Sequence, residues 1–403
     1  RRDEKDSQNC HDGAPFIPFQ QDTKPMRIEK DALGEMPLPD GAYYGIQAFR
    51  SLSNFDVTDK TFNDYPAVVR ALAEIKKACA LANRDIGALG ADKAGAIARA
   101  CDDILEGRME GQFPVNIWRG GGTSINMNLN EVIANRANEL LTGHKGYEQV
   151  HPNTHVNMCQ SSNDVYPTAE NIVLYRETGR ALEGVAALEN SFARKSKEFG
   201  GVVRLGRTCL QDGVPMTLGQ VFAGFHGVIR RSRKRLEALR EGFRVGVLGG
   251  TVIGTGLGVL PGYVEAVYPH LSAIVGFEMR LPDTPEGSPV SDAGLFDAMQ
   301  NADGLLTLSG ALKVLACSAG KIANDFRLLS SGPRSGFGEI RLPAVAPGSS
   351  IMPGKINPFM CDLVVQIMHQ VAANDWAITM NASASDLDLA SNATVSFFAL
   401  LQS

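Results

Sequence analysis

The chain has 403 residues, of which 44% are hydrophobic, so it is long and apolar enough to bury a large core. Its formal charge is −5, from 39 basic and 44 acidic residues, and this balance argues against nucleic acid or an anionic membrane as a partner. We expect a globular protein of two or more domains that acts on a small molecule.

Cysteine usage and the N-terminal sequence indicate where the protein works. The seven cysteines lie far apart and form no CxxC pair, so the pattern favours neither a disulfide framework nor a zinc site. The N-terminal segment is charged where a signal peptide would carry an apolar core, and no run of eighteen apolar residues occurs. These features predict a cytoplasmic protein that is neither secreted nor inserted into a membrane.

The first part of the chain divides into a tail and a helical region. Residues 1–26 are polar and contain several prolines and glutamines, and we interpret them as a mobile tail. Residues 27–160 alternate short loops rich in Pro and Gly with stretches of helical periodicity, such as residues 68–83. We therefore expect a mostly helical N-terminal domain after the tail.

Residues 161–403 carry the strongest architectural signal. Apolar residues from Leu218 to Phe243 recur with the four-three spacing of a coiled-coil seam, interrupted only by Ser232, and residues 305–329 repeat the spacing. Residues 182–192 and 364–378 mark two further helices. Long helices with such seams must pack lengthwise, so the fold class is mainly α, with an elongated helical bundle as central domain. The lack of strand–helix alternation disfavours a doubly wound sheet.

Four polar clusters stand beside the predicted helices. They are residues 120–128 (GGGTSINMN), 160–164 (QSSND), 206–212 (GRTCLQD) and 348–358 (GSSIMPGKINP). Each has an ordinary structural interpretation, because small hydroxyl residues cap helices and Gly and Pro form turns. Helix N-termini and glycine-rich loops also bind anions through free N–H groups, and the last cluster adds two hydroxyls, an ammonium group and an amide. Such groups are the parts of a carboxylate site.

Two other patterns carry less weight. Residues 254–258 (GTGLG) resemble a dinucleotide loop, but a predicted long helix precedes them and no βαβ unit surrounds them. His151 and His155 have the spacing of a metal pair, yet Pro152 and Asn153 between them argue against a shared helical face. We expect neither a dinucleotide nor a metal site here, and assign the histidines to capping or surface positions.

Taken together, the four clusters resemble the aspartase and fumarase superfamily, and the likeness runs from Arg27 to the end of the chain. Residues 348–358 match its signature GSSxMPxKxNP, and the other clusters occur in the family's order. Within the superfamily, residues 122–128, 155–164, 214–220 and 327–343 look more similar to aspartate ammonia-lyases. Fumarases usually have glutamine in place of Ser124, whereas Ser162 is the fumarase-like choice.

The resemblance implies that the chain eliminates ammonia from aspartate to give fumarate, without a cofactor or a metal. Ser349 would take the carbon-bound proton, helped by Lys355 and Asn357. Proton removal beside a carboxylate creates a doubly charged aci-carboxylate, which needs many hydrogen-bond donors. Relatives usually have histidine or glutamine where this chain has Cys209, near the leaving group. The implied substrate-binding residues are Thr123, Ser161, Ser162, Asn163, Thr208, Cys209 and Ser350.

The superfamily also implies an assembly. Its members are homotetramers in which the long helices of four chains form one bundle, and each active site draws loops from three chains. Residues 161–403 would supply that bundle. The family's small C-terminal domain has no counterpart in this chain, and residues 395–403 are apolar and helix-like without a C-terminal stop signal.

Two alternatives stay open from the sequence. A fumarase would add water, instead of ammonia, to the same carbon of fumarate. A catalytically silent structural homologue, of the kind recruited as lens crystallins, is the more remote possibility. The presence of Ser349, Lys355 and Asn357 argues against the silent homologue.

Overall fold

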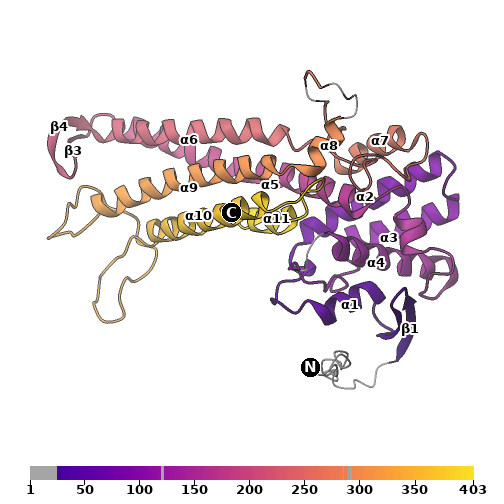
Figure 1. Ribbon diagram of the computed structural model, residues 1–403. Helices are drawn as coiled ribbons and strands as arrows, with labels where there is room; N and C mark the ends of the chain where they lie inside the picture. The colour runs from indigo at the N-terminus through magenta and orange to yellow at the C-terminus, as the bar shows by residue number, and fades with distance from the viewer. Residues whose placement is uncertain (1–24, 119–121, 285, 289, 291–292) are drawn as a thin grey trace, which may run out of the picture.

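The computed structural model describes residues 25–118, 122–284, 286–288, 290 and 293–403 (Figure 1). Within these ranges the chain is mainly α-helical, as predicted, and its strands form two antiparallel sheets of two strands each. The expected tail, residues 1–26, lies outside the described residues except for its last two, and the first strand begins at Met26. The domain boundary at residue 160 stays a prediction.

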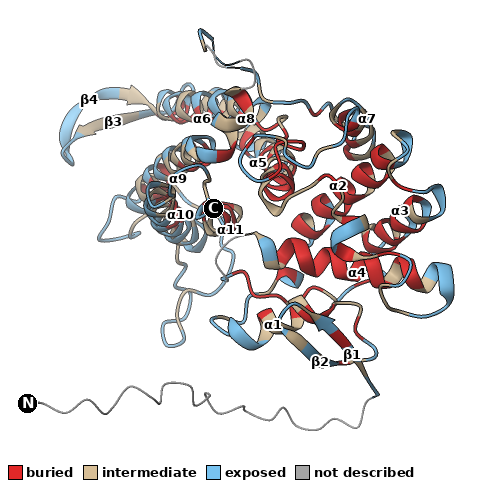
Figure 2. Cartoon of the chain, turned by 45° about the vertical axis from the view of Figure 1, so that its right-hand side comes forward, coloured by how far each residue is buried: buried red, intermediate tan, exposed pale blue. Residues whose placement is uncertain are grey.

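The N-terminal part is a group of short helices beside a hairpin. Its elements are β1 (Met26–Asp31), β2 (Gly34–Pro39), α1 (Ile46–Asn54), the 3-10 helix η1 (Phe62–Asp64), α2 (Pro66–Asp85), α3 (Ala91–Leu105) and α4 (Thr123–Thr142). Helix α2 begins with Pro66 in its first turn, where the missing N–H has no helical partner to lose. The periodicity of residues 68–83 is confirmed as α2, and α2 and α4 are largely buried (Figure 2).

Four long helices form the elongated arm of the molecule (Figure 1). They are α5 (Ser162–Glu198), α6 (Leu218–Glu241), α9 (Asp303–Leu329) and α10 (Phe359–Ser383). Helix α6 starts at a capping box: the Thr217 hydroxyl oxygen accepts from the Gln220 N–H at 3.2 Å, and the Gln220 amide oxygen accepts from the Thr217 N–H at 2.9 Å. Each long helix coincides with one expected from the sequence, so the helical bundle is confirmed.

Shorter elements complete the chain. The π-helix η2 (Pro152–Val156) precedes α5, the helices α7 (Tyr263–Val275) and α8 (Ala293–Gln300) separate α6 from α9, and α11 (Ala393–Leu401) follows α10. The second hairpin, β3 (Val203–Thr208) with β4 (Gln211–Thr217), joins α5 to α6 at the tip of the arm (Figure 1). This connection is a tight turn, so α5 and α6 run antiparallel.

An aromatic cluster stabilises the arm. It consists of Phe192 from α5, Phe222 and Phe225 from α6, and Phe326 from α9, and the ring centroids of contacting pairs lie between 5.6 and 6.1 Å apart. These separations fall in the range favoured by aromatic pairs. Ile229, one turn along the same face of α6, is fully buried. The seam predicted on α6 therefore faces the interior of the bundle.

Part of the apolar surface of the arm is exposed in a single chain. Helix α10 exposes Leu363, Ile367, Trp376 and Met380. By length and composition alone α9 could cross a membrane, and 33% of its most apolar window is buried. In the structure α9 packs against α10 and α6, as core helices of bundles do. The absence of a membrane partner stays a prediction.

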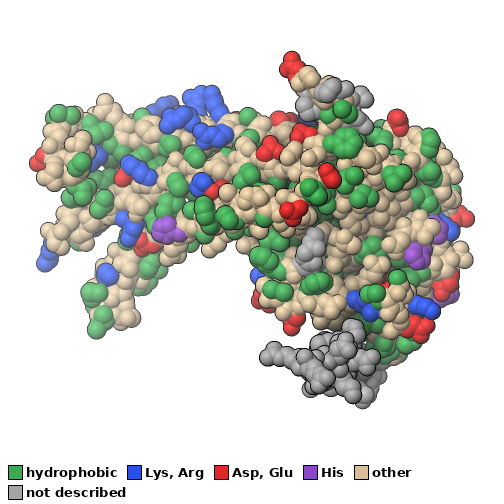
Figure 3. Space-filling model, in the orientation of Figure 1, with side chains coloured by type: hydrophobic (Ala, Val, Ile, Leu, Met, Phe, Trp, Pro, Cys, Tyr) green, Lys and Arg blue, Asp and Glu red, His purple; other side chains and the backbone are tan. Residues whose placement is uncertain are grey.

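The exposed side of α6 is basic. Arg230, Arg231, Lys234 and Arg235 are all exposed, and Figure 3 shows basic side chains gathered over this helix. The net charge of −5 gives no hint of this local surface, because acidic residues elsewhere outweigh it. The absence of a nucleic-acid partner, which we inferred from the overall balance, therefore also stays a prediction.

Replacement of Ile229 by alanine is expected to lower the free energy of unfolding by about 2–5 kcal/mol, because it leaves a cavity in the core shared by α5, α6 and α9. Urea titration followed by circular dichroism measures this loss. Val214→Ala in the exposed part of the second hairpin is the control and should cost about 0.5 kcal/mol or less. Equal losses for the two variants would show that the seam does not stabilise the arm.

Candidate active site

A polar cavity of about 480 Å³ lies where α4 and α5 begin. Thr123 is the first residue of α4 and Ser162 the first of α5, and both line the cavity with Ser161 and Asn163. The structure thus brings four predicted substrate-binding residues together. Helix N-termini offer unpaired N–H groups and the positive end of the helix dipole, so this cavity is suited to an anion. Gly120 and Gly121 of the same sequence cluster lie outside the described residues.

The start of α5 fixes the direction of its hydroxyl groups. Ser161 is the N-cap: its hydroxyl oxygen accepts from the Asn163 N–H at 3.2 Å, and the Asp164 carboxylate accepts from the Ser161 N–H at 2.8 Å. The Ser162 hydroxyl oxygen accepts from the Asn126 side-chain amide at 2.9 Å. Each oxygen accepts one hydrogen bond, and each hydroxyl also has a proton, so both can donate to a ligand in the cavity.

Asp164 holds another wall of the cavity in place. Its carboxylate is fully buried and accepts from the backbone N–H groups of Thr251 at 2.9 Å and Gly249 at 3.3 Å. Burial raises the pKa of Asp164 to about 7, although these N–H groups oppose the shift. The Asn163 side-chain amide donates to the Val252 carbonyl at 2.9 Å. Asn163, the residue expected to face the leaving group, therefore also ties α5 to this loop.

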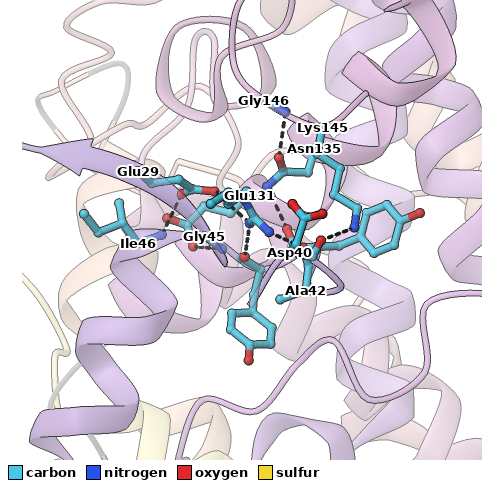
Figure 4. Close-up of polar contacts among 12 residues, drawn as sticks. Glu29, Asp40, Ala42, Gly45, Ile46, Glu131, Asn135, Lys145 and Gly146 are labelled. Carbon is cyan, nitrogen blue, oxygen red and sulfur yellow. Dashed lines mark hydrogen bonds and ion pairs between the residues drawn. The ribbon is translucent and has the colours of Figure 1, made fainter. Parts of the chain in front are cut away.

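The wall formed by α1 is held by two buried carboxylates (Figure 4). Glu131 accepts from the N–H groups of Gly45 at 2.9 Å and Gln47 at 2.8 Å, while Glu29 accepts from the Ile46 N–H at 2.9 Å. A side chain at Gly45 would not fit, because an added Cβ would lie 2.8 Å from the Glu131 carboxyl carbon. Burial, reinforced by the charge of Glu29, raises the pKa of Glu131 to about 8. These contacts place Gln47 at the cavity.

A fully buried lysine lies behind the cavity. The Lys76 ammonium group donates to the side-chain oxygens of Asn157 at 2.9 Å and Gln160 at 2.8 Å, and both of these residues line the cavity. Burial lowers the pKa of Lys76 to about 8. No motif in the sequence pointed to Lys76, Asn157, Glu131 or Gln47 as part of this site. One signal was available: a charged residue at a helical position that the apolar pattern marks as buried. Lys76 occupies such a position in α2.

The loop between α9 and α10 carries four further predicted residues. The Ser349 hydroxyl oxygen accepts from the N–H groups of Ile351 at 3.2 Å and Met352 at 3.0 Å. The Asn357 side chain donates to the Gly348 carbonyl at 2.9 Å and braces the base of the loop. Ser349 and Lys355 line a shallow hollow of about 420 Å³ within the loop, and Ser350 is exposed. Two N–H groups thus already surround the Ser349 oxygen.

Thr208 and Cys209 lie at the tip of the second hairpin. Cys209 and Leu210 form its two-residue turn, with φ angles of 50° and 62°. Two successive left-handed residues define a type I′ turn, which matches the twist of the paired strands. The Cys209 thiol is exposed.

Ion pairs join this hairpin to the loop that follows α9. Arg204 donates to the Glu339 carboxylate at 3.0 Å, and Arg207 pairs with the same carboxylate. Arg207 also lies over the Phe337 ring, with its guanidinium carbon 4.7 Å from the ring centroid. The hairpin and the segment leading to Ser349 are therefore anchored to each other at the same end of the arm (Figure 1).

The predicted site residues form two groups that one chain keeps apart. Ser161, Ser162 and Asn163 lie at the start of α5, whereas Thr208 and Cys209 follow its end. Helix α5 has 37 residues, which corresponds to roughly 55 Å at 1.5 Å per residue. The cavity at one end of the arm and the hairpin with its neighbouring loop at the other end cannot close on one small molecule within a single chain.

His151 and His155 accept hydrogen bonds from backbone N–H groups at η2. His151 caps η2, with its ring Nδ1 accepting from the N–H groups of Asn153 at 3.2 Å and Thr154 at 3.4 Å. The His155 Nδ1 accepts from the His151 N–H at 2.9 Å. The capping role expected for His151 is confirmed. Across the described ranges, no group of three or more His, Cys, Asp or Glu side chains is placed to hold a metal ion.

Comparisons with known proteins agree with this picture. A sequence profile of the lyase family matches residues 34–373. Aspartate ammonia-lyase of a Bacillus species is 43% identical over 380 residues, which cover 94% of this chain and 79% of that protein. Class II fumarate hydratase of Ralstonia nicotianae is 42% identical over 367 residues, covering 90% and 77%.

Solved structures share the fold. Fumarate lyase:delta crystallin from Brucella melitensis bound to cobalt has a TM-score of 0.86 and 44% identity, covering 94% of this chain and 82% of that chain. Class II fumarase from Schistosoma mansoni also has a TM-score of 0.86, with 36% identity and coverage of 94% and 80%. The helical-bundle fold is therefore shared with a fumarate lyase:delta crystallin and with a class II fumarase.

Replacement of Asp164 by asparagine is expected to remove part of the pH dependence of stability. The folded-state pKa of about 7 lies above the ordinary value near 4, so Asp164 stabilises the fold at low pH and loses this contribution as pH rises through 7. The Tm of the variant should therefore rise relative to wild type between pH 4 and pH 7, measured by scanning calorimetry. Glu183→Gln, at an exposed position of α5, is the control. An unchanged difference in Tm across this range would contradict the burial effect.

Proposed function

Because this chain belongs to the lyase family that contains aspartate ammonia-lyases and class II fumarases, we propose that it eliminates ammonia from aspartate to give fumarate. The observation that carries the proposal is the cavity at the start of α4 and α5, where hydroxyl protons and helix N-termini converge as a dicarboxylate requires. The aspartase-like segments 122–128 and 327–343 support aspartate as the substrate.

The first step is binding of the carboxylate next to the carbon that loses its proton. Thr123, Ser161 and Ser162 donate to it from the cavity, and Ser350 joins them from the loop of another chain. Thr208, Lys355 and Asn357 hold the second carboxylate. When the proton leaves, the first carboxylate gains a second negative charge, so donors that shorten their hydrogen bonds to it favour the transition state over the bound substrate.

The second step is proton removal by Ser349. A hydroxyl group acts as a strong base only as an alkoxide, and groups that donate hydrogen bonds to the charged form stabilise it. The N–H groups of Ile351 and Met352 already donate to the Ser349 oxygen, and Lys355 lines the same hollow. Ser349 keeps the abstracted proton. The electron pair then forms the carbon–carbon double bond while the carbon–nitrogen bond breaks and ammonia departs.

The leaving group is placed near Asn163 and Cys209. Asn163 carries a side-chain oxygen that accepts from an ammonium group, whereas the Cys209 thiol is only a weak hydrogen-bond partner. Fumarase activity is the second candidate, because Ser162 matches the fumarase pattern and a class II fumarate hydratase is 42% identical. In that reaction water leaves in place of ammonia, and the carboxylate contacts and the base stay the same.

We also propose that the active unit is a homotetramer in the cytoplasm. One chain separates its two groups of site residues by the length of α5, so a complete site requires loops from neighbouring chains. The exposed apolar face of α10, which includes Leu363, Ile367 and Trp376, is a surface that helices of other chains would cover. Each site then combines the cavity of one chain with the hairpin and the Ser349 loop of others, and needs no cofactor or metal.

Purified protein is expected to produce fumarate from aspartate, and Ser349→Ala should lower kcat at least about 100-fold, because general-base catalysis contributes about that much or more. Absorbance at 240 nm measures fumarate from aspartate and, separately, from malate. Ser53→Ala, at an exposed position of α1, is the matched control and should leave kcat unchanged. Fumarate from malate alone would exclude the aspartase assignment, and no turnover of any dicarboxylate by wild type would support the silent homologue.

Mixing two inactive variants tests the shared site. Ser349→Ala and Ser162→Ala damage different groups of residues, so mixed assemblies contain some sites with neither defect. We expect activity to return when the two variants are unfolded together in denaturant and refolded, as measured by the fumarate assay. Each variant refolded alone is the control. A mixture that stays as inactive as its components would show that one chain supplies the whole site.

A further inference from the structure

We propose that Lys76 is a positioning residue that makes Ser162 a hydrogen-bond donor to the substrate carboxylate, acting through Asn157 and Asn126. The inference rests on the proposed function, because it assigns Ser162 a carboxylate to bind. It adds a buried residue that does not itself line the cavity.

The first link is the orientation of two amide groups. The Lys76 side chain is fully buried, and its hydrogen bonds go to the neutral oxygens of Asn157 and Gln160. A buried ammonium group is costly to desolvate and must be surrounded by acceptors. It therefore requires the oxygen, and not the NH₂ group, of each amide to point toward it. Lys76 thus holds both amides in this orientation, together with Asn130, which donates to the same Asn157 oxygen at 3.1 Å, and with the backbone carbonyls that accept from the two NH₂ groups.

The second link is Asn126. The Asn157 side-chain oxygen, fixed by Lys76, also accepts from the Asn126 amide at 3.1 Å, and the same Asn126 nitrogen donates to the Ser162 hydroxyl at 2.9 Å. The NH₂ group has two protons, so it can serve both partners. If Asn126 were flipped, its oxygen would face the Asn157 oxygen and repel it. The orientation set by Lys76 is therefore passed on to Asn126.

The third link is the Ser162 proton. Its oxygen accepts from Asn126, and among the described residues no hydrogen bond uses its proton, so the proton remains for a ligand in the cavity. If the Asn126 amide had the opposite orientation, Ser162 would donate its proton to the Asn126 oxygen and turn a lone pair toward the incoming carboxylate. Each donor in such a chain also polarises the next, which strengthens the last hydrogen bond.

No acidic side chain among the described residues forms a hydrogen bond with the Lys76 ammonium group, which donates to two neutral amide oxygens. Asp164 on α5, whose charge acts on Lys76, accepts from the backbone N–H groups of Ser161, Gly249 and Thr251. Burial raises the pKa of the thiols of Cys79 on α2 and Cys101 on α3, and that of the Tyr263 hydroxyl on α7, so these groups stay neutral near pH 7. The buried ammonium therefore adds an attractive field for a dianion in the cavity.

A double-mutant cycle tests the relay with succinate, a dicarboxylate that cannot react. Lys76→Met should raise the Kd for succinate by about 10- to 100-fold, the usual range for the loss of a charged hydrogen bond. In a Ser162→Ala background the same change should weaken succinate binding by a clearly smaller factor, because the relay has lost its end point and only the field of the charge is removed. Equal factors in both backgrounds would overturn the proposal. Lys77→Met, which removes the adjacent ammonium paired with Asp102 at 2.6 Å, is the matched control.

Two further measurements keep the outcomes separate. Asn126→Leu breaks the relay at its middle link and must show the same coupling to Ser162, so it decides the question if Lys76→Met does not fold, as judged by thermal melting. Wild-type turnover is measured in parallel. If wild type neither binds succinate nor forms fumarate, the proposed function fails; if wild type does both while the cycle is additive, only the relay fails.

Discussion

Helix α5 sets the distance that the rest of the structure must accommodate. A helix of 37 residues is a stiff rod, because backbone hydrogen bonds close its turns except where Pro167 lacks an N–H, so the cavity at its start and the hairpin after its end cannot approach each other. The aromatic cluster of α5, α6 and α9 fixes the arm along its length. The ion pairs of Glu339 then place the Ser349 loop with the hairpin. Each chain therefore keeps its two groups of predicted site residues at opposite ends of the arm.

The charged groups near the cavity form hydrogen bonds with other residues of the protein. Asp164 holds the loop of Gly249 and Thr251, Glu131 holds the start of α1, and the Lys76 ammonium is occupied by two amide oxygens. Burial raises the pKa of Asp164 and Glu131 and lowers that of Lys76, because desolvation penalises the charged form of acids and bases alike. What remains at the surface of the cavity is a set of neutral donors on two helix N-termini. Such a surface binds an anion without placing a fixed negative charge against it.

The long helices and the four polar clusters could be predicted from the sequence, because seam spacing and short motifs are local patterns. The sequence was not sufficient for Lys76 or Glu131. Lys76 contacts residues 81 and 84 positions away, and Glu131 contacts residues 83 to 86 positions away, so no local spacing reveals them. The hairpin of β3 and β4 was also missed, because its strands are exposed or half-buried on both faces and lack the alternation that marks a core strand. The roles of Ser349 and its neighbours came from family likeness, which no backbone pattern supplies.

The backbone at Cys209 restricts which side chains evolution or protein engineering can place there. With φ at 50°, this position favours glycine, asparagine, aspartate and histidine, and penalises β-branched residues. Leu210, at 62°, shares the restriction, so both turn residues draw on a short list. Variant libraries at residue 209 should therefore be limited to glycine, asparagine, aspartate and histidine. Because the turn lies at the exposed tip of the arm, far from the aromatic cluster, such changes would leave the packing of the bundle untouched.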